Sequence, residues 1–114
     1  MGRATVLEVK EFPEVLNATQ ARLFLGEVQS YLYNDRPCIV LNCSRIGKAG
    51  ALSIHLLLCC LEETIKRNGD VKLASVPAEA ICALKLEGVD RLFEVFDTNT
   101  EAVNSFRRFS LNTA

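Results

Sequence analysis

The sequence predicts a single α/β domain built on a largely parallel sheet. Short apolar or alternating segments of strand length recur along the chain, and segments with helical spacing of their apolar residues separate them. The 114 residues match the length of one domain. With 49% hydrophobic and 24% charged residues, the chain has an ordinary globular composition without the signature of disorder.

The first predicted strand and helix open the chain. Residues 5–10 alternate as a strand, and Pro13 closes it or confines it to a sheet edge. Asn17 and Gln20 have the spacing of a capping box, so a helix is expected over 18–33. The apolar positions with helical spacing in this segment are Ala21, Phe24, Leu25, Val28 and Leu32.

A second strand and helix follow. The continuous apolar run 38–41 is typical of a central strand covered on both faces, and it ends at Asn42. A loop over 43–50 leads into a helix predicted over 51–67. Gly69 is expected to take the left-handed conformation that ends this helix.

The second half of the chain predicts two more strands and two more helices. In order they are a strand over 71–76, a helix over 77–87, an edge strand over 93–96 and a final helix. Gly88 terminates the first of these helices. Thr98 or Asn99 is expected to cap the second.

The helix predicted over 51–67 is apolar around most of its circumference. One stripe at helical spacing consists of Ile54, Leu57, Leu58, Leu61 and Ile65. The remaining apolar residues either pack under neighbouring elements or form an exposed interaction patch. Cys59 shares a face with His55, but nothing obvious in the sequence lowers the pKa of its thiol.

Charge and hydropathy exclude two classes of partner. With 13 Lys and Arg against 14 Asp and Glu, the net charge is −1, so we expect no nucleic-acid ligand. The longest apolar stretch, residues 49–61, is shorter than the roughly 18–20 residues of a membrane helix, so no direct membrane insertion is expected. The N-terminal residues lack a signal-peptide core, and the five cysteines lack Cys-x-x-Cys spacing, which together predict a cytoplasmic protein with reduced, buried thiols.

The sequence offers little for catalysis or metal binding. His55 is the only histidine, and no carboxylate or Cys is expected at ligand spacing beside it, so we predict no metal site and no cofactor. Gly47 and Lys48 precede a helix, but Asn42 and Ala49 replace the glycine and the hydroxyl that a phosphate-binding Walker loop requires. No constellation of side chains favours an enzyme.

Two stretches carry a family likeness. Residues 84–97 match the pattern L-x-x-x-G-[LV]-D-x-L-F-x-[IV]-x-[DS], and residues 41–46 follow L-D-L-S-x-[VI] at Leu41, Ser44 and Ile46. With the order of strands and helices, they resemble the STAS domain, the fold of bacterial anti-sigma factor antagonists and of the cytosolic tails of sulfate transporters. The resemblance implies one STAS-like domain over residues 1–114, with a single layer of mostly parallel, four- to five-stranded sheet and helices packed on it.

In that family, an Asp-Ser-[Ser/Thr]-Gly motif at a helix start carries the hydroxyl that a partner kinase phosphorylates. Aligned without gaps, the motif falls on Gly50, Ala51, Leu52 and Ser53, so a leucine stands at the acceptor position. Ser53 is the remaining candidate for phosphorylation, although one residue turns it about 100° around the helix. A hydrogen bond in the first turn is its ordinary role, and Ser44 is expected to serve the turn at the strand end.

The resemblance implies a protein-binding regulator rather than an enzyme. It would be an anti-sigma factor antagonist that captures an anti-sigma factor or switch-protein kinase, without the usual serine phosphorylation switch. The alternative is a scaffold or accessory subunit of a transporter or signalling assembly, or a homodimer. The predicted partner-binding residues are Asn42, Ser44, Arg45, Ile46, Gly47, Lys48, Gly50, Ala51, Leu52, Ser53, His55 and Leu56.

Overall fold

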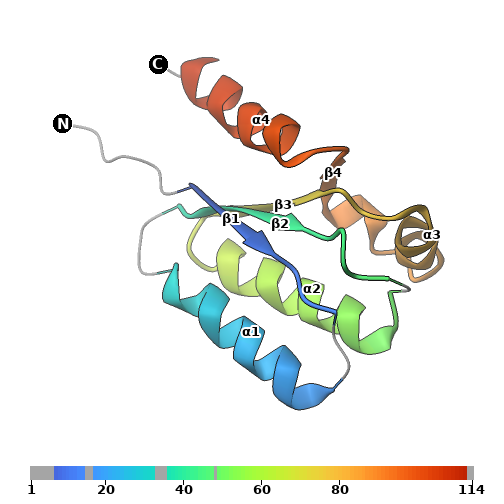
Figure 1. The fold of residues 1–114 in the computed structure, drawn as a ribbon. Coiled ribbons are helices and arrows are strands. Elements are labelled where there is room, and N and C mark those ends of the chain that lie inside the picture. The colour runs from blue at the N-terminus through green and yellow to red at the C-terminus, as the bar shows by residue number, and fades with distance from the viewer. Residues whose placement is uncertain (1–6, 15–16, 33–35, 48, 113–114) are drawn as a thin grey trace.

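A four-stranded parallel sheet forms the centre of the molecule (Figure 1). The structure is a computed structural model that describes residues 7–14, 17–32, 36–47 and 49–112. Its strands are β1 (Leu7–Glu11), β2 (Cys38–Asn42), β3 (Asp70–Ala74) and β4 (Glu94–Phe96), which neighbour one another in chain order. Every neighbouring pair is parallel, so the predicted α/β architecture is confirmed.

Helices cover both faces of the sheet. They are α1 (Ala18–Ser30), α2 (Ala51–Ile65), α3 (Ala78–Leu86) and α4 (Asn99–Asn112), with a 3-10 turn η1 (Asp90–Leu92) before β4. In Figure 1, α1 and α2 lie side by side under one face, and α4 lies alone over the other. None of the helices in the described residues is long and apolar enough to cross a membrane.

The larger core lies between the sheet and helices α1, α2 and α3. Successive strand residues point to opposite faces, so every second residue enters this core. Ile39 and Leu41 of β2 and Val71 and Leu73 of β3 are buried there, opposite the buried Leu57 of α2. Two neighbouring central strands therefore present continuous apolar surface to the three helices.

The smaller core lies under α4. Its buried members are Val40 of β2, Ala74 of β3 and Ala102 of α4, with partly buried residues packed around them. Two of the three are alanines, so the helix approaches the sheet closely but removes little side-chain area from water.

A lysine occupies the middle of this smaller core. Lys72 of β3 is only 6% exposed. Its ammonium donates to Ser105 Oγ at 2.7 Å, lies 3.3 Å from Glu94 Oε1 and sits 4.2 Å from the centroid of the Phe106 ring. These contacts compensate the desolvation that burial imposes on a charge.

Three helices and one strand end earlier than predicted: α1 ends at Ser30, α2 at Ile65 and α3 at Leu86. After α1 the Tyr31 amide bonds three residues back, to Val28 O, and after α2 the Arg67 amide does the same, to Thr64 O, although the Lys66 amide still bonds four residues back, to Glu62 O. β3 covers residues 70–74 rather than 71–76, because Ser75 has a left-handed φ of 57° that interrupts the extended backbone.

Gly69 has a different role from the one predicted. Asn68, not Gly69, takes the left-handed conformation, with φ of 60°. A Cβ on Gly69 would lie 2.1 Å from the carbonyl oxygen of Pro37, so no other residue fits without a shift of backbone. The amide of Asp70 donates to the same carbonyl at 2.9 Å. The connection from α2 to β3 is therefore held against the residue that leads into β2.

The predicted caps at the starts of α1 and α4 are present. Asn17 Oδ1 accepts from the Gln20 amide at 2.9 Å at the start of α1. Of the two candidates for α4, Thr98 is the cap, since its Oγ1 accepts from the Glu101 amide at 3.1 Å.

Candidate functional site

The candidate site lies where β2 ends and α2 begins. In open sheets of parallel strands, the loops at the carboxyl ends of the strands are where ligand sites are usually found. The loop 43–50 leaves β2 at this edge and leads directly into α2. Backbone bonds hold its first part: Cys43 N donates to Ala74 O at 2.8 Å, and Ile46 N donates to Cys43 O at 3.0 Å.

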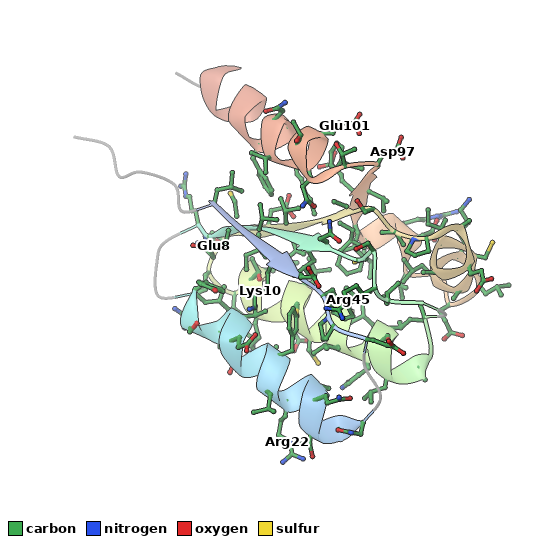
Figure 2. The ribbon with its side chains drawn as sticks, viewed as in Figure 1. Glu8, Lys10, Arg22, Arg45, Asp97 and Glu101 are labelled. Atoms are coloured by element: carbon green, nitrogen blue, oxygen red, sulfur yellow. The ribbon has the colours of Figure 1, made fainter. Side chains whose placement is uncertain are left out.

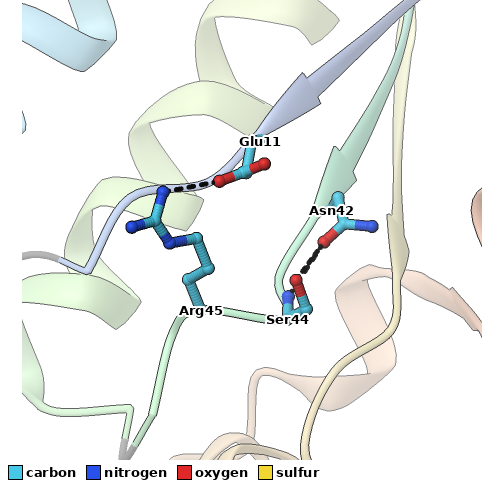
Figure 3. A network of polar contacts seen from close by, with 4 residues as sticks. All are labelled: Glu11, Asn42, Ser44 and Arg45. Carbon is cyan, nitrogen blue, oxygen red and sulfur yellow. Dashed lines mark hydrogen bonds and ion pairs between the residues drawn. The ribbon is translucent and has the colours of Figure 1, made fainter.

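Asn42 is the hub of the polar contacts at this edge (Figure 3). Its Oδ1 accepts from Ser44 Oγ at 2.7 Å and from the Ser44 amide at 3.0 Å. Its Nδ2 donates to Asn99 Oδ1 at 2.8 Å, at the first residue of α4. Ser44 thus serves the strand-end turn as predicted, and Asn42 joins the loop to a helix 57 residues later in the chain.

Arg45 extends from the same loop toward the end of β1 (Figure 2). Its Nη1 donates to Glu11 Oε1 at 2.7 Å, and that hydrogen bond raises the pKa of Arg45. Both side chains are exposed, so the ion pair adds little to stability. The contact restrains the guanidinium at the end of β1.

The structure corrects three of the predicted surface residues. Ile46, Ser53 and Leu56 are 3%, 4% and 2% exposed, so they support the site from inside and do not line its surface. The inward face of α2 is rotated relative to the predicted stripe: Leu58 is half-buried and Ile65 is exposed.

Thr64 explains part of this rotation. Its Oγ1 donates to the Cys60 carbonyl at 2.7 Å, so a hydroxyl can be fully buried on the inward face. Ile65, the next residue, is then directed outward. The extensive apolarity of α2 is therefore mostly accommodated in the core, and the broad exposed patch considered from the sequence is absent from the described part of this helix.

The remaining predicted residues that the structure describes lie at the surface or are half-buried. Asn42 and Leu52 are half-buried, and Lys48 lies outside the described residues. The exposed members are Ser44, Arg45, Gly47, Gly50, Ala51 and His55. Small and polar groups thus dominate the accessible part of the site. We name these six residues, together with Asn42 and Leu52, the β2–α2 surface.

His55 has a neighbour that the sequence reasoning did not place at ligand spacing. The Sγ atom of Cys59 lies 3.5 Å from His55 Nε2, so the expectation that no Cys stands beside this histidine is wrong. The i, i+4 spacing that puts both residues on one helix face also brings their side chains into contact. Burial, followed by the charges of Glu62 and Glu63, raises the pKa of the Cys59 thiol, so the pair is not an activated nucleophile.

Two bracing residues were missed because tertiary structure alone brings them to the site. Glu11 contacts Arg45 across 34 residues, and Asn99 contacts Asn42 across 57. Parallel pairing explains the position of Glu11, because β1 and β2 end at the same edge and Glu11 is in register with Asn42. No sequence signal marks Asn99 beyond its position at the start of a helix.

Solved structures of known proteins share this parallel α/β fold with helices on both faces. The chain superposes on an anti-sigma-factor antagonist (STAS) domain protein from Planctomyces limnophilus with a TM-score of 0.71 and 17% identity, over 83% of this chain and 86% of that chain. No protein-family model matches the sequence, and no curated protein matches it.

A second protein, TM1081, gives two further matches. Its NMR structure matches with a TM-score of 0.75 and 25% identity, over 88% of this chain and 81% of that chain. Its crystal structure, described as that of a candidate anti-sigma factor antagonist from Thermotoga maritima, matches with a TM-score of 0.68 and 24% identity, over 89% of this chain and 81% of that one. The chain therefore has the STAS fold, as the family likeness predicted.

Proposed function

We propose that this chain is a protein-binding regulator of the anti-sigma factor antagonist type, which captures an anti-sigma factor or switch-protein kinase in the cytosol. The observation that carries the proposal is the β2–α2 surface: an accessible loop and helix start at the carboxyl edge of a STAS fold. Two of the structures that share this fold bear the name anti-sigma factor antagonist in their descriptions.

The bracing of the surface supports a binding role. Asn42 ties the loop to α4, and Glu11 restrains Arg45, so these groups are ordered before a partner arrives. A surface ordered in advance loses less conformational entropy on association, which favours affinity. Gly47, with a φ of 62°, turns the loop without presenting a side chain.

The proposed binding is not switched by phosphorylation at the helix start. Leu52 has no hydroxyl, and Ser53 is 4% exposed, so a kinase would reach Ser53 only after the first turn of α2 opened. The phosphorylation of Ser53 considered from the sequence is thus disfavoured by its burial. Partner binding would instead depend on the amounts of the two proteins.

The test uses the complete chain and two matched variants. Each anti-sigma factor encoded in the same genome is presented to the immobilised protein, and the dissociation constant is measured. Ala51→Arg places a long cation on the β2–α2 surface, while Ala78→Arg places one at the equivalent first position of α3, and both alanines are exposed. We expect Ala51→Arg to weaken the complex at least about tenfold, or about 1.4 kcal/mol, and Ala78→Arg to leave it unchanged.

Two outcomes would contradict this function. If no anti-sigma factor binds with a Kd below about 10 μM, the scaffold or accessory-subunit reading takes its place. If incubation with a bound switch kinase and ATP adds the mass of one phosphate, and Ser53→Ala removes that addition, then the unswitched version of the proposal is wrong.

A further inference from the structure

His55 and Cys59 form an accessible pair of metal-ligand atoms on α2. They are four residues apart, so their side chains are neighbours on the same face of the helix, about one turn apart. His55 is exposed and Cys59 is half-buried, and their Nε2 and Sγ atoms are 3.5 Å apart. The proposed antagonist function uses neither the thiol nor this contact.

The separation of the two atoms is the one that a tetrahedral zinc ion requires. Zinc binds sulfur at about 2.3 Å and imidazole nitrogen at about 2.0–2.1 Å, so across a tetrahedral angle the two ligands lie about 3.5–3.6 Å apart. The observed 3.5 Å agrees with that spacing. The two atoms are therefore already as far apart as the two ligands of one tetrahedral zinc ion.

The rest of α2 holds the pair in place and supplies a favourable field. Ile54, Leu57 and Cys60 are buried beside them, which fixes the helix backbone that carries both ligands. Glu62 and Glu63 follow Cys59 on the same helix, and their negative charges attract cations to this part of the surface.

We propose that His55 and Cys59 bind one zinc-class divalent cation as a two-residue chelate, with water in the other coordination positions. Zinc and its relatives select imidazole and thiolate, whereas magnesium and calcium select oxygen. Among the described residues no group of three or more His, Cys, Asp and Glu side chains is placed to hold a metal, so the site is open rather than closed by a third protein ligand. An open position can exchange ligands with a partner or small molecule.

Cobalt(II) is the probe for this site, because a cobalt–thiolate bond gives a charge-transfer absorption that zinc itself lacks. The complete, reduced chain is titrated with cobalt in buffer without chelators. We expect the absorption to saturate at one cobalt per chain and to disappear when zinc is added, because zinc binds such ligands more tightly than cobalt.

Three variants make the test specific. Cys59→Ser and His55→Gln should each weaken cobalt binding at least about tenfold, since even the loss of second-shell partners costs roughly 10- to 100-fold. Cys82→Ser, at an exposed cysteine on α3, should leave binding unchanged. Circular dichroism verifies that each variant is folded.

Three results would overturn the chelate: no absorption in the unmodified chain, an absorption that survives Cys59→Ser, or saturation at one cobalt per two chains. None of them bears on the antagonist function, because the titration contains no protein partner.

Discussion

The side of the sheet under α1, α2 and α3 is packed with large aliphatic side chains, whereas the side under α4 has two alanines, one valine and a buried lysine at its centre. Among the described residues, the first side buries many more large apolar side chains, and burial of apolar area is the dominant stabilising term in folding. The second side depends on polar contacts that roughly offset the cost of burying a charge. The α4 side is therefore expected to open at a lower free energy than the rest of the domain.

The largest expected effect is a loss of stability at alkaline pH, which arises from thiols buried on the side of α1, α2 and α3 only, among the described residues. Cys43 and Cys60 both lie in the larger core, and burial raises the pKa of each to about 12 from 9.0. Their folded pKa exceeds the unfolded value, so the stability they contribute is complete below pH 9 and is lost as pH rises toward 12. The slope is about 1.4 kcal/mol per pH unit for each thiol, or about 2 kcal/mol each between pH 8 and 10.5.

Urea unfolding with a reductant at pH 8 and 10.5 measures this loss. Cys43→Ala should halve the decrease in the free energy of unfolding that the two thiols cause between these pH values. Cys82→Ala, at an exposed position, should leave that decrease unchanged. An equal loss in the wild type and in Cys43→Ala would contradict the assignment of the effect to the larger core.

A matched pair of valines compares the two sides directly. Val71 and Val40 lie on neighbouring strands, are essentially unexposed, and face the larger and the smaller core respectively. We expect Val71→Ala to cost about 2–3 kcal/mol, because close packing leaves a cavity, and Val40→Ala to cost about 1–2 kcal/mol, because α4 can settle onto the sheet. Denaturant midpoints at pH 7 give both values, and a larger loss for Val40→Ala would reverse the comparison.

The smallest expected effect is that of the buried lysine. Lys72→Met removes a desolvated charge and keeps a flexible chain against the Phe106 ring, so the free energy of unfolding should change by less than about 1 kcal/mol. Lys85→Met, on the exposed surface of α3, is the control. A loss above about 2 kcal/mol for Lys72→Met alone would show that polar contacts, rather than apolar burial, hold α4 to the sheet.

The strands and helices could be predicted because their signals are local. The apolar run of β2, the caps at Asn17 and Thr98, and the glycine after α3 each act within a few residues. Parallel pairing also followed, since strands that alternate with helices have no short return path. The helix ends were less predictable, because the choice between bonds to the third and the fourth preceding carbonyl depends on contacts outside the helix.

The candidate site was predictable only in its position along the chain. The surface was expected between residues 42 and 56, but which side chains point outward depends on the rotation of α2, and the hydroxyl of Thr64 tolerates burial through a bond to Cys60. The neighbours of Arg45 and Asn42 come from β1 and α4. Sequence spacing cannot report such contacts, because the fold alone sets the distance between these elements.

The close approach of Gly69 to Pro37 bears on how the chain tolerates change. Together with the bond from Arg36 N to Arg67 O at 3.0 Å, this contact joins the residues that lead into β2 to those that lead into β3, at the amino-terminal end of both strands. The corner that these contacts form lies at the opposite end of the strands from the loop that carries Arg45. Substitutions in the loop 43–50 at the opposite end of the strands can therefore accumulate while this corner keeps the strands aligned.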